Sequence, residues 1–89
     1  MTGPKLTMYS RKRCGLCDEA RTVILAQLRE TEFDFEEIFI DGDHELERAY
    51  GLRVPVVLVD GAEEFETQVE PELLRQALGP PSQPGSLRI

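Results

Sequence analysis

The apolar positions of the chain change their period several times, and each change predicts a different element. Alternating residues between Gly3-Pro4 and Ser10 predict a strand over residues 5–9. Farther along, the apolar residues recur at helical spacing and predict an amphipathic helix. Its apolar face is formed by Leu16, Ala20, Val23, Ile24 and Leu28. The opposite face, which includes Arg21, is expected to be solvated.

Aromatic and β-branched residues after this helix predict a second strand over residues 34–40. The alternation shifts by one residue inside this segment, so the strand either begins near Phe35 or carries a bulge. The following Asp-Gly-Asp has turn and capping chemistry, which predicts a short helix over residues 43–50. Gly51 suits the left-handed position that ends such a helix.

The most apolar run of the chain covers residues 54–59 and is rich in β-branched residues. It predicts a strand that is buried on both faces and is opened by Pro55. The next two residues, Asp60-Gly61, are typical of a tight turn. We therefore expect an antiparallel hairpin whose second strand lies near residues 63–66 and whose edge is kept soluble by charge.

A last apolar pattern at helical spacing begins at Pro71 and predicts a helix that ends at Gly79. The predicted order is β-α-β-α-β-β-α. A right-handed crossover makes the first two strands parallel, and the hairpin adds antiparallel pairing. We therefore expect an α/β fold with a four-stranded mixed sheet flanked by three helices. Residues 1–79 would form the single domain and residues 80–89 a flexible tail.

The charge balance excludes some classes of partner. Ten Lys and Arg residues face seventeen Asp and Glu residues, and the net charge is −7. Such a chain is not expected to bind nucleic acid or an anionic membrane surface. No run of about 18 apolar residues is present, so we expect a cytoplasmic protein. We also expect a monomer. The Glu-rich stretches and His44, in the first turn of the short helix, are interpreted as solvated.

The chain has two cysteines, Cys14 and Cys17, and they lie where the first strand meets the first helix. A sulfur at a helix start gains from the unpaired backbone N–H groups and the positive end of the helix dipole. We therefore expect a lowered pKa for the Cys14 thiol, which would be the attacking sulfur. Cys17, one turn later, can close an intramolecular disulfide. This pattern predicts redox chemistry.

Two motifs together resemble glutaredoxin-like members of the thioredoxin-fold superfamily. The first is the Cys-Gly-Leu-Cys sequence at residues 14–17 after a short strand, and the second is the Val-Pro pair within residues 50–57. The resemblance covers about residues 5–78. It implies a thioredoxin-like fold and a thiol-disulfide oxidoreductase.

The resemblance also implies roles for single residues. Pro55 would be cis and would face the cysteines, while the backbone of Val54 would pair with the peptide-like part of a thiol substrate. Arg11 stands where glutaredoxins carry a cation that holds a substrate carboxylate, and Arg48 and Arg53 are weaker candidates of this kind. Leu16 offers an apolar contact to a protein partner.

The Gly-Gly and acidic pair that hold the glutamyl end of glutathione in the family are replaced by Glu-Thr-Gln-Val-Glu at residues 66–70. Glutathione is therefore left open as a co-substrate, and no resident cofactor or metal is predicted. The expected partner is a disulfide-containing protein or a low-molecular-weight thiol. Two alternatives stay open: a zinc or iron–sulfur module that uses the same cysteines without turnover, and a redox-inert fold that contacts proteins through Leu16 and the proline loop.

Overall fold

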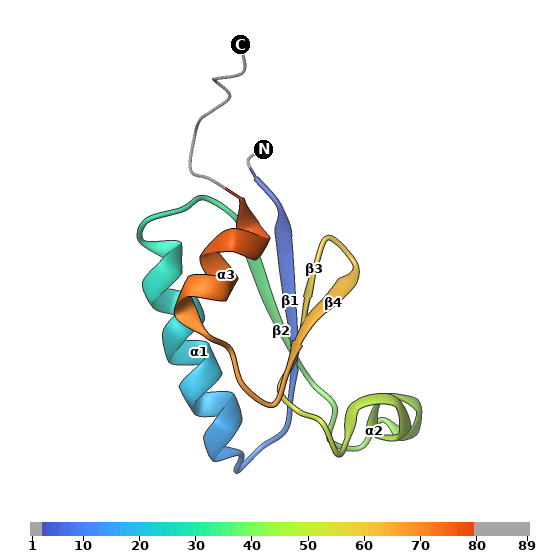
Figure 1. The fold of residues 1–89 in the computed structure, drawn as a ribbon. Coiled ribbons are helices and arrows are strands. Elements are labelled where there is room, and N and C mark those ends of the chain that lie inside the picture. Colours follow the sequence, from blue (N-terminus) through green and yellow to red (C-terminus); the bar gives the residue numbers. More distant parts are fainter. Residues whose placement is uncertain (1–2, 80–89) are drawn as a thin grey trace.

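A computed structural model describes residues 3–79 of the chain (Figure 1). The strands and helices follow in the predicted order: β1 (Lys5–Ser10), α1 (Gly15–Leu28), β2 (Asp34–Phe39), α2 (His44–Tyr50), β3 (Val56–Val59), β4 (Ala62–Glu66) and α3 (Pro71–Leu78). The thioredoxin-like α/β fold is confirmed. The predicted flexible tail, residues 80–89, lies outside the described part of the chain.

The four strands form one mixed sheet in the order β2-β1-β3-β4. The central strand β1 runs parallel to β2 and antiparallel to β3, and β3 pairs antiparallel with β4. The pairing of β1 with β2 is regular from end to end, so the bulge considered for β2 is absent. The irregularity lies in β4, where Phe65 and Glu63 pair with consecutive residues of β3 and Glu64 is left over.

Two helices, α1 and α3, lie side by side against one face of the sheet (Figure 1). The main core fills the space between them and the sheet. Its buried members are Leu6, Met8, Ala20, Ile24, Phe33, Val57, Val59, Val69, Leu74 and Leu78. Each fully buried Leu, Ile or Met side chain contributes about 1.5–3 kcal/mol to folding, so this layer holds α1 firmly in place.

Helix α2 lies on the other side of the sheet, near the end at which α1 begins (Figure 1). It has no fully buried residue, and Leu46 and Tyr50 are half-buried. These two side chains pack against a second, smaller cluster formed by Cys17, Ile40 and Val54. The small cluster therefore joins α2 to the segment that carries the cysteines.

The buried face of α1 differs in part from the predicted one. Leu16 and Leu28 are 40% and 37% exposed, whereas Cys17 and Gln27 are buried. Gln27 is accommodated because its Nε2 donates a 2.7 Å hydrogen bond to Oγ1 of Thr31, which is also buried. The buried face of α1 is therefore centred on Ala20 and Ile24 and is turned about the helix axis relative to the predicted face.

The turn chemistry predicted for the hairpin is confirmed. Asp60 and Gly61 form the two-residue connection from β3 to β4, and their φ angles are 52° and 88°. Positive φ at both positions is the requirement of the turn that matches the twist of paired strands. The Asp60 carboxylate also accepts a 2.9 Å hydrogen bond from the backbone N–H of Lys5, which fixes the turn to β1.

The start of α2 is as predicted, but its end is not. Asp43 caps the helix and accepts hydrogen bonds of 3.1 Å from the N–H groups of Glu45 and Leu46. The prediction for Gly51 is wrong, because its φ of −53° is right-handed. The chain continues with a further turn, in which the Arg53 N–H donates to the Tyr50 carbonyl at 2.8 Å, so no left-handed residue is needed.

The third strand begins two residues later than predicted, at Val56. Val54 and Pro55 are buried but take no part in the strand pairing, because proline has no N–H to donate to a ladder. These two residues form a connection rather than a strand. Among residues 3–79, no helix is both long enough and apolar enough to cross a membrane.

Candidate active site

The two cysteines lie at the junction of β1 and α1 and form a disulfide with a Cα–Cα distance of 5.2 Å. Cys14 is the N-cap of α1, with extended backbone angles of −122° and 106°. Its Sγ accepts a 3.1 Å hydrogen bond from the backbone N–H of Cys17. The sulfur therefore occupies the place that a Ser or Asp oxygen takes in most helix caps, where negative charge is favoured.

The two sulfurs differ in access to solvent. Cys14 is half-buried, whereas Cys17 is completely buried in the small cluster beside Ile40. Leu16, between them, is exposed. Cys14 is therefore the more accessible of the two cysteines from solvent.

The Val54–Pro55 bond is cis, as the resemblance implies. Val54 packs in the same cluster as Cys14 and Cys17, so the proline loop and the disulfide adjoin. Within residues 3–79, the backbone N–H and C=O of Val54 make no hydrogen bond. Unpaired backbone groups beside a reactive sulfur can bind an extended peptide as an added strand.

Two stacked aromatic rings pack against the cluster that contains Val54. The rings of Tyr9 and Tyr50 stack with centroids 4.3 Å apart, and the guanidinium of Arg53 lies 5.6 Å from the Tyr50 ring centroid. Burial raises the pKa of Tyr50, with a further contribution from Tyr9. Arg53 also donates hydrogen bonds to Glu63 and Glu66, at 3.1 Å and 2.8 Å. Through these hydrogen bonds, Arg53 holds the proline loop against β4.

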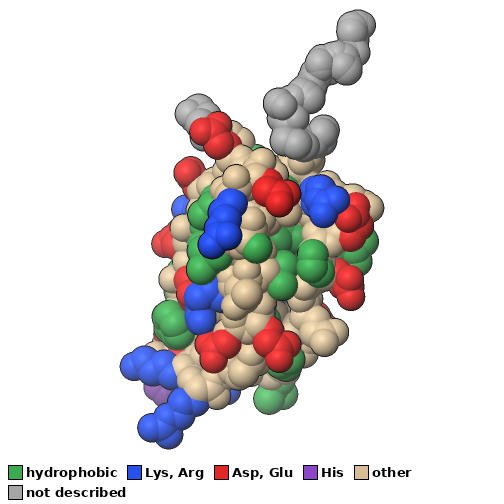
Figure 2. Space-filling view, turned by 90° about the vertical axis from the view of Figure 1, so that its left-hand side faces the viewer, with side chains coloured by type: hydrophobic (Ala, Val, Ile, Leu, Met, Phe, Trp, Pro, Cys, Tyr) green, Lys and Arg blue, Asp and Glu red, His purple; other side chains and the backbone are tan. Residues whose placement is uncertain are grey.

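Two residues of the basic run before Cys14 contact α2 or the loop that leads to it. Arg11 approaches the Glu47 carboxylate at 3.9 Å and its side chain is 37% exposed. The backbone of Lys12 donates a 3.0 Å hydrogen bond to Asp41, and Arg13 is exposed with a φ of 56°. Figure 2 shows a group of basic side chains at the lower corner of the molecule, the end at which α1 begins.

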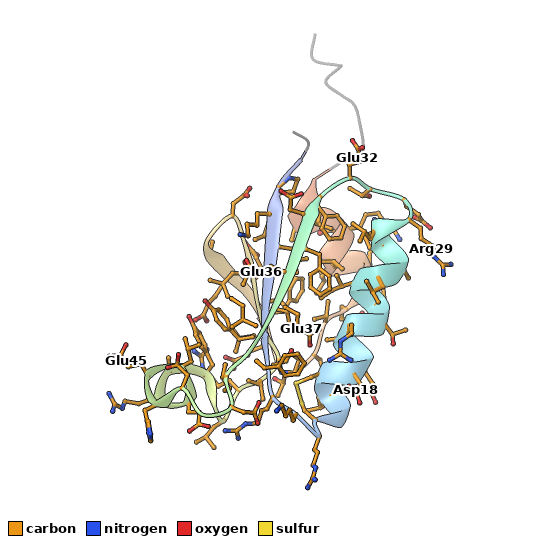
Figure 3. The ribbon with its side chains drawn as sticks, turned by 180° about the vertical axis from the view of Figure 1, so that it is seen from behind. Asp18, Arg29, Glu32, Glu36, Glu37 and Glu45 are labelled. Carbon is orange, nitrogen blue, oxygen red and sulfur yellow. A yellow bond between two sulfur atoms is a disulfide. The ribbon has the colours of Figure 1, made fainter. Side chains whose placement is uncertain are left out.

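One ion pair near the site was not expected from the sequence. Arg21 of α1 donates hydrogen bonds of 2.8 Å and 2.6 Å to the two carboxylate oxygens of Glu37 in β2, and a third of 2.9 Å to Asp18. Figure 3 shows Glu37 on the side of β2 that faces α1, with Asp18 near the start of the helix. The predicted solvation is therefore wrong for Arg21 and Glu37, whereas Glu36 beside Glu37 is exposed as predicted. The sequence held one signal, a basic residue on α1 and an acidic pair in β2, the next element along the chain.

The burial of this pair has an electrostatic consequence. The Glu37 side chain is 15% exposed and that of Arg21 is 29% exposed. The hydrogen bonds from Arg21 lower the pKa of Glu37, against an opposing effect of burial. The same contacts raise the pKa of Arg21. The pair thus fastens the first half of α1, which carries the disulfide, to the edge strand β2.

Ser10, the last residue of β1, is also completely buried. Its hydroxyl oxygen makes no hydrogen bond of good geometry within residues 3–79, although the hydroxyl lies close enough to Glu37 to help lower the pKa of that carboxyl. His44 is exposed at the start of α2, as predicted, and lies outside the small cluster. In the described part of the chain, no three His, Cys, Asp or Glu side chains form a group that could hold a metal ion.

The fold and the cysteine site together define a protein of the thioredoxin superfamily. More specifically, the family model for the Glutaredoxin-like domain (DUF836) matches residues 5–79, and the chain belongs to that family. Uncharacterized protein Rv0508 of Mycobacterium tuberculosis is 30% identical over 80 residues, which cover 84% of this chain and 82% of that protein. The family and the disulfide fit a thiol redox role.

Solved structures agree with this assignment. Structural genomics target XcR50 from X. campestris is 44% identical with a TM-score of 0.69, covering 82% of this chain and 93% of that one. Ne2328 from Nitrosomonas europaea is 28% identical with a TM-score of 0.76, covering 89% and 95%. A mutant thioredoxin from Halobacterium salinarum has 24% identity, a TM-score of 0.61 and coverage of 86% and 73%. This last likeness shows a shared fold.

Proposed function

We propose that the protein is a thiol-disulfide oxidoreductase in which Cys14 and Cys17 cycle between dithiol and disulfide. The observation that carries the proposal is the asymmetry of the pair, a half-buried sulfur at a helix cap bonded to a fully buried one. Such an arrangement favours a thiolate at Cys14 and protects the intermediate from a second external thiol.

In the first step, the Cys14 thiolate attacks one sulfur of a substrate disulfide. A bond forms between Cys14 and that sulfur, the substrate S–S bond breaks, and the other substrate sulfur leaves as a thiolate and takes up a proton. The N–H of Cys17, which lies 3.1 Å from the Cys14 sulfur, stabilises the negative charge before attack.

In the second step, Cys17 loses its proton and attacks the Cys14 sulfur. The Cys14–Cys17 bond forms, the mixed disulfide breaks, and the remaining substrate sulfur leaves as a thiol after protonation. The substrate gains two electrons and the protein loses two. The burial of Cys17 supports its role as the resolving residue, because it leaves Cys17 a single partner within reach.

The other predicted residues would bind the substrate. The free N–H and C=O of Val54 would pair with the substrate backbone next to the reacting cysteine, and Pro55 would hold this segment against the disulfide. Leu16 would supply an exposed apolar contact. Arg11 would meet a substrate carboxylate on the side that faces α2.

Turnover requires a reductant for the Cys14–Cys17 disulfide. We propose that a low-molecular-weight thiol or a dithiol protein supplies the two electrons, with glutathione as one candidate. Nothing in the chemistry of the cysteines requires a resident cofactor. The natural substrate would be a disulfide-containing protein, and the protein would act as a monomer in the cytoplasm.

The test compares Cys14→Ser and Cys17→Ser in a disulfide-reduction assay with dithiothreitol as the electron source. Cys14→Ser should abolish turnover of a protein disulfide, while reduced Cys17→Ser, freed of dithiothreitol before it meets the substrate, should accumulate a mixed disulfide at Cys14. Metal content is measured on the same preparations. Full activity of Cys14→Ser, or stoichiometric zinc or iron bound through the cysteines, would overturn the proposal in favour of a binding module.

A further inference from the structure

A groove begins beside the disulfide and runs between α1 and the segment that joins β4 to α3. Its apolar lining comes from both walls and consists of Leu16, Ala20, Val23 and Val69. The hollow measures about 110 Å³. Because an engineered cavity of roughly 150 Å³ takes up a benzene molecule, this one has room for a single side chain.

Two carboxylates complete the groove. Glu19 lines it from α1 and Glu70 from the opposite wall, and no Lys, Arg or His is among its lining residues. Both side chains are exposed. Within residues 3–79 neither carboxylate forms an ion pair or accepts a hydrogen bond, in contrast to Glu37, Glu63 and Glu66. Both charges are therefore available to a cation that enters the groove.

The second wall is tied to the proline loop. The backbone N–H of Thr67 donates hydrogen bonds to the carbonyls of Pro55 and Arg53, at 2.8 Å and 3.1 Å. Thr67 itself holds a φ of 67°, a conformation that is uncommon for a β-branched residue. The groove thus adjoins both the disulfide, through Leu16, and the loop that leaves the Val54 backbone unpaired.

The two sides of the disulfide differ in charge. Arg11 contacts Glu47 of α2, and none of the three basic residues before Cys14 is among the lining residues of the groove. Figure 2 shows the face formed by α1 and α3, on which acidic, basic and hydrophobic side chains alternate. An apolar hollow with two free carboxylates fits a side chain that has an aliphatic stem and a cationic head, because the stem can be buried while the charge stays at the rim.

We infer that this groove receives a lysine or arginine next to the reacting cysteine of a disulfide-bonded substrate protein. This assignment rests on the proposed function and names its substrate class: basic cysteine-containing segments. The γ-glutamyl end of glutathione carries a carboxylate beside its ammonium group. Glu19 and Glu70 would attract this ammonium group but repel the carboxylate beside it. The groove therefore favours a basic peptide over glutathione.

The experiment uses the reduced full chain and short peptides whose cysteine is disulfide-bonded to 2-thio-5-nitrobenzoate. The peptides differ at one position, adjacent to the cysteine on either side, which holds Lys, Ala or Glu. Release of the coloured thiol gives the second-order rate constant. Each rate constant is divided by that of the same peptide with dithiothreitol, which removes the effect of the neighbouring charge on intrinsic reactivity.

The expected normalised rate constant for the better Lys peptide is about tenfold above that of its Glu counterpart at low salt, and this ratio falls as salt is added. The double variant Glu19→Gln, Glu70→Gln should bring the ratio to within about twofold. The matched control is Glu30→Gln, Glu32→Gln, which removes two exposed charges at the far end of α1 (Figure 3 labels Glu32) and should keep the preference.

Three results would overturn the inference. Equal rate constants for Lys and Glu peptides would do so while leaving the exchange activity intact. A preference that survives in the groove variant, or that disappears equally in the control, would assign it to the net charge of −7 instead of to the groove. A wild-type protein that reacts with none of the peptides would overturn the proposed function together with the inference.

Discussion

The ion pair between Arg21 and Glu37 allows a quantitative prediction about how α1 is held. Replacement of Glu37 by Gln removes the charge and preserves the shape of the side chain. Replacement of Asp18 by Asn removes the other carboxylate that contacts Arg21. The two variants therefore test the same cation with partners that differ in burial, since the Glu37 side chain is 15% exposed and that of Asp18 is 70% exposed.

The expected magnitudes follow from that difference. Two charge-assisted hydrogen bonds, of 2.8 Å and 2.6 Å, are lost with Glu37. Hydrogen bonds to charged groups contribute about 1.5–3 kcal/mol, and Gln can still accept one, so Glu37→Gln should lower the free energy of unfolding by about 2 kcal/mol at pH 7. Asp18→Asn should lower it by about 0.5 kcal/mol or less, because an exposed pair is screened by solvent.

The pH dependence provides an independent check. Arg21 lowers the pKa of Glu37 below its ordinary value of 4.5 in the folded protein. The stabilisation is therefore complete above the pKa of the unfolded chain and is lost as the pH falls through the folded value. Gln does not titrate, so the difference between wild type and Glu37→Gln should shrink as the pH falls below about 4.5.

Urea unfolding of the oxidised proteins, followed by circular dichroism between pH 3 and pH 7, measures these differences. The reasoning would be refuted if Asp18→Asn were as destabilising as Glu37→Gln, since burial would then not decide the energy. A difference for Glu37→Gln that stayed constant down to pH 3 would show that packing, and not charge, is what the substitution removes.

Three further substitutions test local features by the same unfolding measurement. Gly15→Ala should stabilise by about 0.5–1 kcal/mol, because a Cβ there meets nothing within 4 Å and α1 has ordinary helical geometry; a loss of stability would contradict this. Ser10→Ala should stabilise by about 1 kcal/mol by removing a buried hydroxyl that makes no hydrogen bond of good geometry, and destabilisation would show that its interaction with Glu37 outweighs the cost of its burial. Thr67→Gly should be neutral or stabilise by up to about 1 kcal/mol, because relief of the positive φ offsets the entropy that glycine adds to the unfolded chain, whereas a clear loss of stability would contradict this.

Local signals made most of the fold predictable. The hairpin followed from Asp60-Gly61, whose two positive φ angles are a property of the dipeptide, and the start of α2 followed from the capping chemistry of Asp43. The conformation of Gly51 was predicted wrongly because a glycine after a helix can adopt either a right-handed or a left-handed backbone conformation. The continued turn to Arg53, which a local pattern does not specify, decided the conformation.

The site was predictable only where its residues are close in sequence or carry a motif. Cys14 and Cys17 were found by their spacing, and the place of Pro55 beside them came from resemblance. The pair of Arg21 with Glu37 joins residues that lie sixteen positions apart, and the groove joins α1 to residues 67–70. Such contacts depend on how strands and helices are placed against one another, which amphipathic periodicity does not specify. Periodicity alone therefore assigned the charged residues of these contacts to solvent.

The most direct test of the account is an equilibrium titration of the protein in defined glutathione redox buffers, with mass spectrometry of the acid-quenched species. We expect a reversible two-electron transition between the dithiol and the Cys14–Cys17 disulfide, and a glutathione adduct at Cys14 when Cys17 is replaced by Ser. If both thiols stayed reduced in oxidising buffer, or if the adduct formed at Cys17 in Cys14→Ser and not at Cys14 in Cys17→Ser, the proposed exchange mechanism would be contradicted.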